Sequence, residues 1–416
     1  MKIRVGLFFG GKSVEHEVSV ISAAQTAAAM DMEKYQVIPI YITKDNEMYT
    51  GDSLFTPAHY RDMGSLLARS QRVALIRDKG KVYVMRYPAK LFVKPLLSQL
   101  DLAFPVIHGT NGEDGSLQGF FQLHGLPYVG SGVGASSCGM DKWAAKCLLH
   151  SAGLPVLPGH CFQSMDYYEE PDRVIRELEG FHEYPLIVKP VNLGSSVGIG
   201  AAHGREELRD CIELAASFSE RILIEPLLLF AREINCAVLG DDDRTEASAC
   251  EEPLSTGEIL SYRDKYQGGG YRGKAALAEP AGYAQSAGHT PSARKSSAKG
   301  MESAMRKLPA ELEKETEDKI KALARQAFQA LHCNGVARVD FLYDQAGGRV
   351  YINELNTIPG SLSFYLWEAE GKPFRQLTEE LIQLALKRNR IQERIIWSNE
   401  VNLLSGAAQG IKGLKG

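Results

Sequence analysis

Polar and apolar residues alternate along segment 336–356 on both sides of a Gly-Gly turn, which is the pattern of a β-hairpin. Alternation places Glu354 and Asn356 on one face of the second strand, and Asp340 can join them from the first. Two carboxylates and a carboxamide are hard oxygen ligands that suit Mg²⁺ shared with substrate phosphates. A solvated strand face would show the same alternation. Arg338, in the same phase, favours the site, because a cation beside carboxylates indicates an anionic reactant.

Continuous apolar runs at 3–9, 37–42 and 100–107 predict buried strands of a parallel sheet. The first run stops at a glycine turn and leads into apolar positions at helical spacing. Glu15 therefore falls at a helix N-terminus on the carboxyl edge of the sheet, where ligands bind in such folds. An acidic residue there can also simply favour the positive helix end. The last run ends in a similar turn that carries His108, and two such loops indicate one shared ligand site.

A second set of strands, predicted at 184–190 and 222–225, flanks a short Gly-Ser loop at 194–198. Such a loop can lie over phosphates and donate its amides to their oxygens, although a plain hairpin turn needs no ligand. It is not a Walker A loop, because it lacks the GK[ST] that opens a helix. Lys189, just before the loop, favours a nucleotide, and the apolar connection 225–230 can line a flat aromatic ligand such as adenine.

These patterns divide the chain into three predicted domains and a tail. The first domain covers residues 1–130, the second 131–225 and the third 226–395. Within the third, the composition over 267–300 changes to glycine, alanine, serine and basic residues without periodicity, which predicts a flexible insertion. The last residues, 396–416, contain few apolar side chains and predict a loosely held tail.

Composition limits the partners. The chain has 416 residues, 44% hydrophobic and 24% charged, which is typical of a globular protein in water. A net charge of −4 gives no support for a nucleic-acid partner. No apolar run approaches the roughly 18 residues of a membrane helix and the N-terminus lacks signal-peptide features, so we expect no membrane partner. Seven cysteines without a CxxC pair are typical of reduced thiols, and we expect a cytoplasmic protein.

Six short motifs follow one another along the chain: GGKSVEHEVS, HGTNGEDG, MDK, GSSVG, DKY, and ARVDF followed by NELNTIPG. In this order they resemble the D-alanine–D-alanine ligase family, over roughly residues 1–390. The resemblance implies an α/β, three-domain ATP-grasp fold, with an N-terminal Rossmann-like parallel sheet unit and two α+β domains that grip ATP. It also implies ATP-dependent ligation of two D-alanines through an acyl phosphate, for peptidoglycan precursor synthesis.

The resemblance implies which residues bind the first D-alanine. Glu15 would hold the ammonium of the first D-alanine and form a hydrogen-bonded triad with Ser195 and Tyr266. His108 would lie near the same substrate. The family habit further implies a homodimer that takes only small-molecule substrates, D-alanine and ATP.

The resemblance also implies an ATP and metal set. The ATP residues would be Lys142, Lys189 and Lys265 at the phosphates, Ser195 and Ser196 in the loop, Glu225, Leu227 and Leu228 at adenine, and Glu233 at the ribose. Asp340, Glu354 and Asn356 would carry two Mg²⁺ or Mn²⁺. Arg338 and the amide of Gly360 would form the oxyanion hole.

One departure from the family leaves the second substrate open. Tyr365 and Leu366 stand where the family has a serine-leucine pair for the carboxylate of that substrate, and a phenol is larger than serine. A ligase that joins D-alanine or another amino acid to a different second substrate is therefore an alternative. Tyr266 favours an amine over a hydroxy acid as the second substrate. The resemblance implies that family members that use a hydroxy acid carry a histidine in this loop instead. A non-catalytic ATP-binding module is disfavoured by the retained Glu15, Arg338 and predicted metal ligands.

Overall fold

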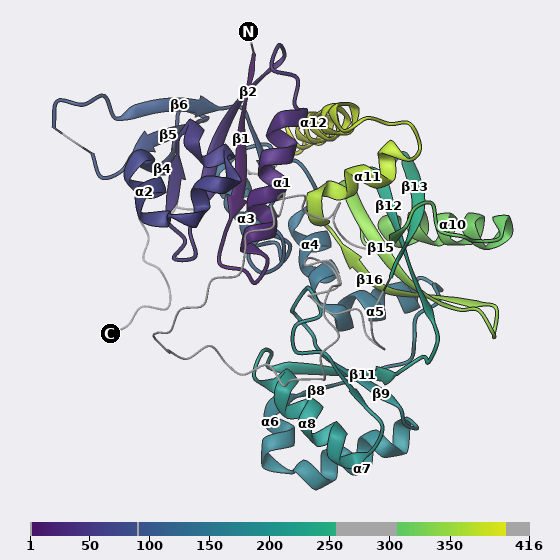
Figure 1. The fold of residues 1–416 in the computed structure, drawn as a ribbon. Helices are drawn as coiled ribbons and strands as arrows, with labels where there is room; N and C mark the ends of the chain where they lie inside the picture. The colour runs from purple at the N-terminus through teal and green to yellow at the C-terminus, as the bar shows by residue number, and fades with distance from the viewer. Residues whose placement is uncertain (1, 90, 255–305, 397–416) are drawn as a thin grey trace, which may run out of the picture.

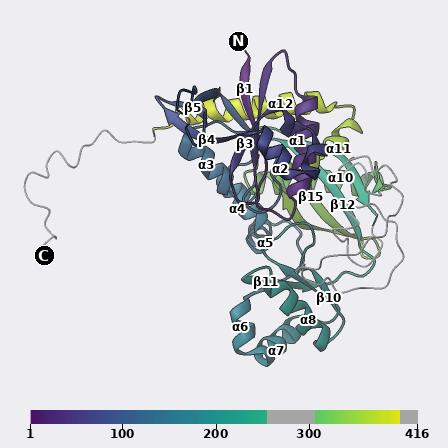
Figure 2. The same cartoon turned by 60° about the vertical axis from the view of Figure 1, so that its left-hand side comes forward.

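The computed structural model describes residues 2–89, 91–254 and 306–396. Three β-sheets follow one another along the chain (Figure 1). The second sheet and its helices lie below the other two, in the original view and after rotation (Figure 2). Lys265, Tyr266, the predicted insertion at 267–300 and the tail beyond residue 396 lie outside the described residues.

The first sheet has seven strands in the order β6-β5-β4-β3-β2-β1-β7. They are β1 (Ile3–Gly10), β2 (Tyr35–Ile42), β3 (Met48–Thr50), β4 (Gln71–Asp78), β5 (Lys81–Arg86), β6 (Leu96–Leu100) and β7 (Leu102–Pro105). β1 runs parallel to β2 and β7, as the apolar runs predict, whereas β2 to β6 pair antiparallel. The sequence analysis missed β3 to β6. The longest of them, β4, has an apolar run of only four residues, 73–76, and buries alternate positions of it, Val73 and Leu75.

The carboxyl ends of β1 and β7 meet at one edge of this sheet, because the two strands are parallel neighbours. Helix α1 (His16–Ala29) begins there, with Glu15 as its N-cap residue. Ser19 in α1 joins the turns after both strands. Its hydroxyl accepts the N–H of Gly10 at 2.8 Å and donates to the carbonyl of Val106 at 2.7 Å. The two glycine-rich loops are therefore held side by side, as the shared ligand site requires.

The second sheet is antiparallel, with the order β10-β9-β11-β8, and the third is antiparallel with the order β14-β13-β12-β15-β16. Their strands are β8 (His160–Gln163), β9 (Leu186–Pro190), β10 (Gly200–Ala202), β11 (Arg221–Pro226), β12 (Arg232–Gly240), β13 (Thr245–Pro253), β14 (Arg306–Lys307), β15 (Gly335–Asp344) and β16 (Arg349–Asn356). β15 and β16 are the predicted hairpin. Arg338 pairs with Asn356 and Asp340 with Glu354 across it, which confirms that prediction.

The longer helices cover the sheets with one apolar face, as in α12 (Phe374–Gln392), where Leu377, Leu381 and Ala385 are buried at helical spacing. The remaining helices are α2 (Met63–Arg69), α3 (Ser116–His124), α4 (Val133–Met140), α5 (Lys142–Ser151), α6 (Ser164–Glu169), α7 (Pro171–Phe181), α8 (Arg205–Ala216), α10 (Lys314–Ala330) and α11 (Phe364–Glu368), with 3₁₀ turns η1 (Asp52–Phe55), η2 (Pro57–Arg61) and η4 (Gly360–Ser363). Among the described residues, none of these helices is both long and apolar enough to span a bilayer.

The first and third sheets share one hydrophobic core. Leu7 and Phe104 from the first sheet are buried in the same cluster as Trp367 from α11 and Leu381 from α12. Helix α12 accordingly lies beside α1 (Figure 1). The second sheet has a separate core of its own, between β9, β10, β11 and the helices α7 and α8. The first and third sheets thus form one unit around a common core, and the second sheet forms a smaller unit with its own core.

Candidate active site

The predicted metal ligands lie together on one face of the hairpin. The Arg338 guanidinium donates to both oxygens of Asp340, from Nε at 2.6 Å and from Nη2 at 2.7 Å, and Asn356 Nδ2 donates to the same carboxylate at 3.1 Å. Burial alone would lower the pKa of Arg338, but its contact with Asp340 outweighs burial and raises that pKa well above its usual value. Arg338 is therefore a permanent cation fixed beside the carboxylate.

This donor set fits a divalent cation that shares phosphate oxygens. In the described part of the chain, His, Cys, Asp and Glu side chains gather nowhere in a group of three or more that could hold a metal. Asp340, Glu354 and Asn356 supply two carboxylates and one carboxamide. Mg²⁺ commonly takes one or two carboxylates and completes its shell with water and phosphate oxygens, so the set suits such an ion and not an all-protein cage.

A cavity lies between the second and third sheets, and six of the nine predicted ATP residues line it. Its lining is formed by Lys142, Leu157, Ile187, Lys189, Ser196, Ile199, Pro226, Leu227, Leu228, Ala231, Glu233, Asn235, Arg338, Asp340, Phe341, Leu342, Asn353 and Glu354. Apolar side chains from both sheets form one end, and cations and carboxylates the other. An apolar slot continuous with a charged end matches a nucleotide, with its flat base and its phosphates.

The predicted phosphate lysines are held by carboxylates and carbonyls. Lys142 donates to the carbonyl of Leu193 at 2.7 Å and lies 3.5 Å from a Glu354 oxygen. Lys189 donates to Asn353 Oδ1 at 2.9 Å and pairs with Glu225 at 2.6 Å. Both ammonium groups therefore line the charged end of the cavity in fixed positions.

Glu225 serves as an anchor for lysines in this structure. Its buried carboxylate pairs with Lys189 and with Lys146, which also donates to the carbonyl of Leu157 at 2.8 Å. Burial would raise the pKa of Glu225, but the two lysines together lower it below its usual value. The carboxylate that the resemblance assigns to adenine is thus committed to cations, and Pro226, Leu227 and Leu228, which follow it, line the cavity. The sequence analysis missed Lys146, although it lies one helical turn after Lys142.

Glu15 and Ser195, 180 positions apart in sequence, are in contact. The Ser195 hydroxyl donates to a Glu15 oxygen, and Ser195 and Ser196 both have a left-handed backbone with φ of 57°. A Cβ on Gly109 would lie 2.7 Å from Glu15 Oε2, and one on Gly194 would lie 2.9 Å from it. The glycines of the HGTNG and GSSVG motifs are therefore needed for both loops to approach this carboxylate.

Glu113 and Glu15 line a second cavity, which shares Lys142 and Glu354 with the first. Glu113 was not singled out from the sequence. Its two oxygens accept the backbone N–H groups of Gly109, at 2.9 Å, and Ile358, at 2.7 Å. Burial and the neighbouring Glu15 raise the pKa of Glu113 to about 8. The sequence signal for Glu113 is its place in the same glycine-rich loop as His108, five positions later.

His108 is engaged on both sides of its ring. Nδ1 lies 2.7 Å from the carbonyl of Ile358 and must donate to it, and Nε2 lies 2.8 Å from the hydroxyl of Ser22. Burial lowers the pKa of His108, so the ring is neutral and Nε2 accepts from Ser22. His108 lies near Glu15, but both ring nitrogens are engaged by protein groups, and its place beside the first D-alanine stays a prediction.

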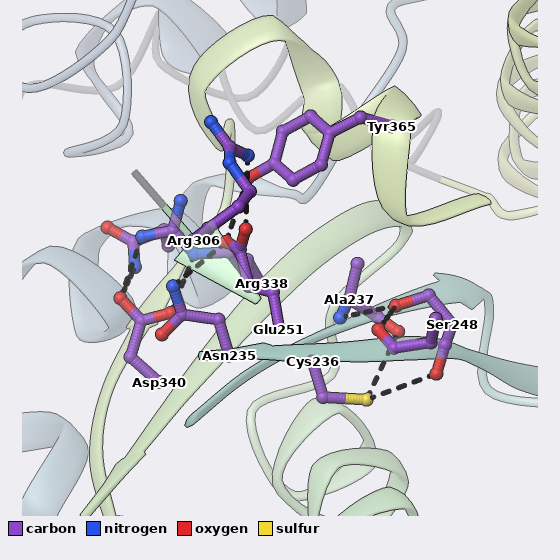
Figure 3. Close-up of polar contacts among 11 residues, drawn as sticks. Asn235, Cys236, Ala237, Ser248, Glu251, Arg306, Arg338, Asp340 and Tyr365 are labelled. Carbon is purple, nitrogen blue, oxygen red and sulfur yellow. Dashed lines mark hydrogen bonds and ion pairs between the residues drawn. The ribbon is translucent and has the colours of Figure 1, made fainter. Parts of the chain in front are cut away.

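The Tyr365 side chain, predicted to contact the second substrate, lies against Arg306 and Glu251 (Figure 3). Its hydroxyl donates to Glu251 at 2.8 Å, its ring stacks under the Arg306 guanidinium at 4.2 Å, and Arg306 pairs with Glu251 at 3.0 Å. Asn235 Nδ2 donates to the same Glu251 carboxylate at 3.1 Å. Burial raises the pKa of Tyr365, which keeps the proton on its hydroxyl. Leu366 is fully buried in the shared core.

A cross-strand row links this cluster to the metal ligands. Glu251 pairs with Asn235, Asn235 with Asp340, and Asp340 with Glu354, across four adjacent strands of the third sheet. Sequence reasoning found the two residues on the hairpin and missed Glu251 and Asn235, because the pairing of distant strands has no local signal. Lys265 and Tyr266, both predicted site residues, lie outside the described residues. Gly360 begins the turn η4, beside α1.

Comparison with known proteins gives consistent matches along the whole chain. Residues 4–131 match the family described as D-ala D-ala ligase N-terminus, and residues 148–289 and 293–383 match D-ala D-ala ligase C-terminus. The D-alanine–D-alanine ligase of Acetivibrio thermocellus is 37% identical over 402 residues, with 93% of this chain and 96% of the relative covered. That of Caldicellulosiruptor bescii is 38% identical over 412 residues, with 96% and 99% covered.

Two solved structures are similar to the whole chain at 28% identity. The D-alanine-D-alanine ligase from Coxiella burnetii has a TM-score of 0.73, with 94% of this chain and 96% of that chain covered. The VanG D-Ala:D-Ser ligase from Enterococcus faecalis also has a TM-score of 0.73, with 92% and 100% covered.

A nucleotide-shaped cavity between two antiparallel sheets, with lysines and carboxylates at its charged end, is the arrangement of the ATP-grasp enzymes. These use ATP to join a carboxylate to a second molecule. Within that class, the chain belongs to the D-alanine–D-alanine ligase family, as its motifs predict.

Proposed function

We propose that this chain joins two D-alanines into D-alanyl-D-alanine at the expense of ATP, as a step in the synthesis of peptidoglycan precursor. The contact between Glu15 and Ser195 carries this proposal. It joins the first sheet to the Gly-Ser loop and leaves a carboxylate beside the charged end of the cavity, where it can bind the ammonium of an amino acid. The names of the relatives support D-alanine as that amino acid.

The cations of the cavity suit the first chemical step. A carboxylate does not react with an amine at neutral pH, because neither of its oxygens is a good leaving group. Transfer of the γ-phosphoryl group to it gives an acyl phosphate, and this step depends on positioning and charge neutralisation. Lys142 and Lys189 would neutralise phosphate oxygens. Asp340, Glu354 and Asn356 would hold Mg²⁺ or Mn²⁺, which supplies further neutralisation when bound.

The second step needs a site for a developing oxyanion. When the second amine attacks the acyl phosphate, negative charge develops on the carbonyl oxygen. Arg338 and the Gly360 amide would stabilise that charge, and removing one such donor typically costs about 3–4 kcal/mol of transition-state stabilisation. Water must be excluded, because it would hydrolyse the acyl phosphate.

D-Serine is a second candidate for the attacking amine. The VanG D-Ala:D-Ser ligase is as similar in fold as the D-alanine-D-alanine ligase of Coxiella burnetii, and the Tyr365 hydroxyl is committed to Glu251. The pocket expected to take the carboxylate of the second substrate therefore differs from that of family members with a serine in place of Tyr365.

A substrate panel tests both candidates. The protein is mixed with ATP, Mg²⁺ and D-alanine, alone or with D-serine or D-lactate, and ADP release and the mass of the product are recorded. The proposal expects D-alanyl-D-alanine from D-alanine alone, and D-serine as the weaker acceptor. ADP release only in the presence of D-serine would favour the second candidate. No ADP release with any D-amino acid would refute both.

The resemblance also supports a cytoplasmic homodimer with three domains that meet near residues 130 and 225. Light scattering after size-exclusion chromatography would test the dimer, with an expected mass of twice 45.7 kDa. A mass equal to that of one chain at micromolar concentration would refute it.

A further inference from the structure

The turn that carries Gly360 has an unusual backbone. Ser361, Leu362 and Ser363 follow it with φ of 51°, 54° and 51°. The left-handed region is disfavoured for residues with a Cβ, and three such residues in succession are rarer still. All three side chains are buried. The turn therefore depends on contacts from outside itself to keep its shape.

Helix α1 of the first sheet supplies part of these contacts. The Ser361 N–H donates to Ser22 Oγ at 3.0 Å, and the Ser361 hydroxyl donates to Gln25 Oε1 at 2.7 Å. Ser22 and Gln25 are three positions apart, so both face the turn from one side of the helix. The first residue of the left-handed run is thus held through its backbone and its side chain.

The loop after β7 supplies the rest. The Ile358 N–H donates to Glu113 and the Ile358 carbonyl accepts from His108, each at 2.7 Å. The Ser22 hydroxyl in turn donates to His108. Ile358 and Ser361 stand on either side of Pro359 and Gly360, so the two ends of the turn are fixed by one connected, buried network.

We propose that Ser22 and Glu113 are positioning residues that hold the Gly360 amide where the oxyanion develops. Neither acts on substrate directly. They act through Ser361 and Ile358, so that the first sheet sets the geometry of a reacting group in the third. This inference rests on the proposed role of the Gly360 amide, and it adds that the amide works only while the contacts from α1 and the Glu113 loop are intact.

The test compares two buried serines. Ser22→Ala removes the acceptor of the Ser361 N–H and the donor to His108. Ser248→Ala is the matched control, because Ser248 is equally buried and also accepts one backbone N–H, from Ala237, and donates to one carbonyl, that of Ala249, but only within the third sheet. Each variant is assayed for kcat, for the KM of ATP and D-alanine, and for thermal unfolding.

The expected result is a drop in kcat of about tenfold or more for Ser22→Ala, with KM for ATP within twofold, because an oxyanion contact acts only in the transition state. Ser248→Ala should lose similar thermal stability and keep kcat within twofold. Gln25→Ala, at a partly exposed position, provides a second variant should Ser22→Ala fail to fold, with a smaller drop in kcat.

A tetrahedral phosphinate analogue of the dipeptide gives an independent readout. Its affinity should fall by the same factor as kcat in Ser22→Ala and in Glu113→Gln, since a glutamine carbonyl cannot accept both N–H groups. Unchanged kcat in Gln25→Ala and Ser22→Ala, or an equal drop in Ser248→Ala, would overturn the positioning role. Absence of dipeptide from the unmodified protein would instead overturn the proposed function, so the two failures are distinguishable.

Discussion

Replacing Gly194 with alanine is expected to weaken the use of the first amino acid about tenfold without unfolding the protein. The new Cβ would lie 2.9 Å from Glu15 Oε2, whereas ordinary van der Waals contact begins at 3.4 Å. The carboxylate therefore has to move by ~0.5 Å. Gly194 does not have a left-handed φ, so alanine brings no backbone strain. A misplacement of ~1 Å at a reacting centre costs on the order of a hundredfold in rate, and half of it about tenfold.

Initial rates of ADP release measure this effect, with D-alanine varied at saturating ATP. The kcat/KM for D-alanine should fall, while KM for ATP stays within twofold, because the cavity proposed to hold ATP is lined by Ser196 and not by Gly194. Gly132→Ala is the matched control. Gly132 has φ of −74° and its Cβ would meet nothing within 4 Å.

Two outcomes would refute this reasoning. Unchanged kcat/KM for D-alanine in Gly194→Ala would show that Glu15 tolerates the displacement or is not needed. An equal loss in Gly132→Ala would show that the effect comes from the backbone and not from the carboxylate.

Three further predictions concern buried polar groups. Tyr365→Phe should lower the free energy of unfolding by about 1–2 kcal/mol in urea, because Glu251 loses a donor, and should leave D-alanine as the preferred acceptor; a switch of acceptor would show that the hydroxyl contacts substrate. Lys146→Met should lower the free energy of unfolding in urea by about 3 kcal/mol, because Glu225 is left with one cation fewer. The double variant Lys146→Met with Glu225→Gln should recover part of this loss. A loss below about 1 kcal/mol in the single variant would contradict the anchoring role of Glu225. The pKa of Glu113 is about 8 in the folded protein, above the value of about 4.3 for an unfolded chain. The free energy of unfolding that this difference contributes is fully present below pH ~4.3 and is lost as the pH rises toward 8. The urea midpoint of the unmodified protein should therefore fall more between pH 5 and pH 8.5 than that of Glu113→Gln, and parallel profiles would count against the shift.

Local patterns were sufficient to predict the hairpin and the parallel strands. Alternation around the Gly-Gly turn placed Asp340 and Glu354 as cross-strand partners, because side-chain direction in a strand follows from sequence spacing. The contact of Glu15 with Ser195 came from the family resemblance, since nothing in either loop alone specifies a partner 180 residues away.

The residues that were missed are charged groups whose burial depends on distant packing. Glu251 and Lys146 look like ordinary surface residues in the sequence, and each is buried only because strands or helices from elsewhere cover it. Tyr365 illustrates the same limit. Its position after the hairpin suggested a contact with the second substrate, and nothing in the local sequence indicates that its hydroxyl donates to Glu251, 114 positions earlier.

The shared core has a consequence for how the chain is made. The first 131 residues form one recognisable family segment, yet the apolar face built by Leu7 and Phe104 is completed by Trp367 and Leu381. A ribosome delivers these two groups more than 250 residues apart, so the N-terminal segment emerges with its face uncovered until synthesis is nearly finished. An isolated fragment cut at residue 131 would keep that face exposed to water and to other copies of itself. The boundary between the family segments is therefore not a boundary in folding.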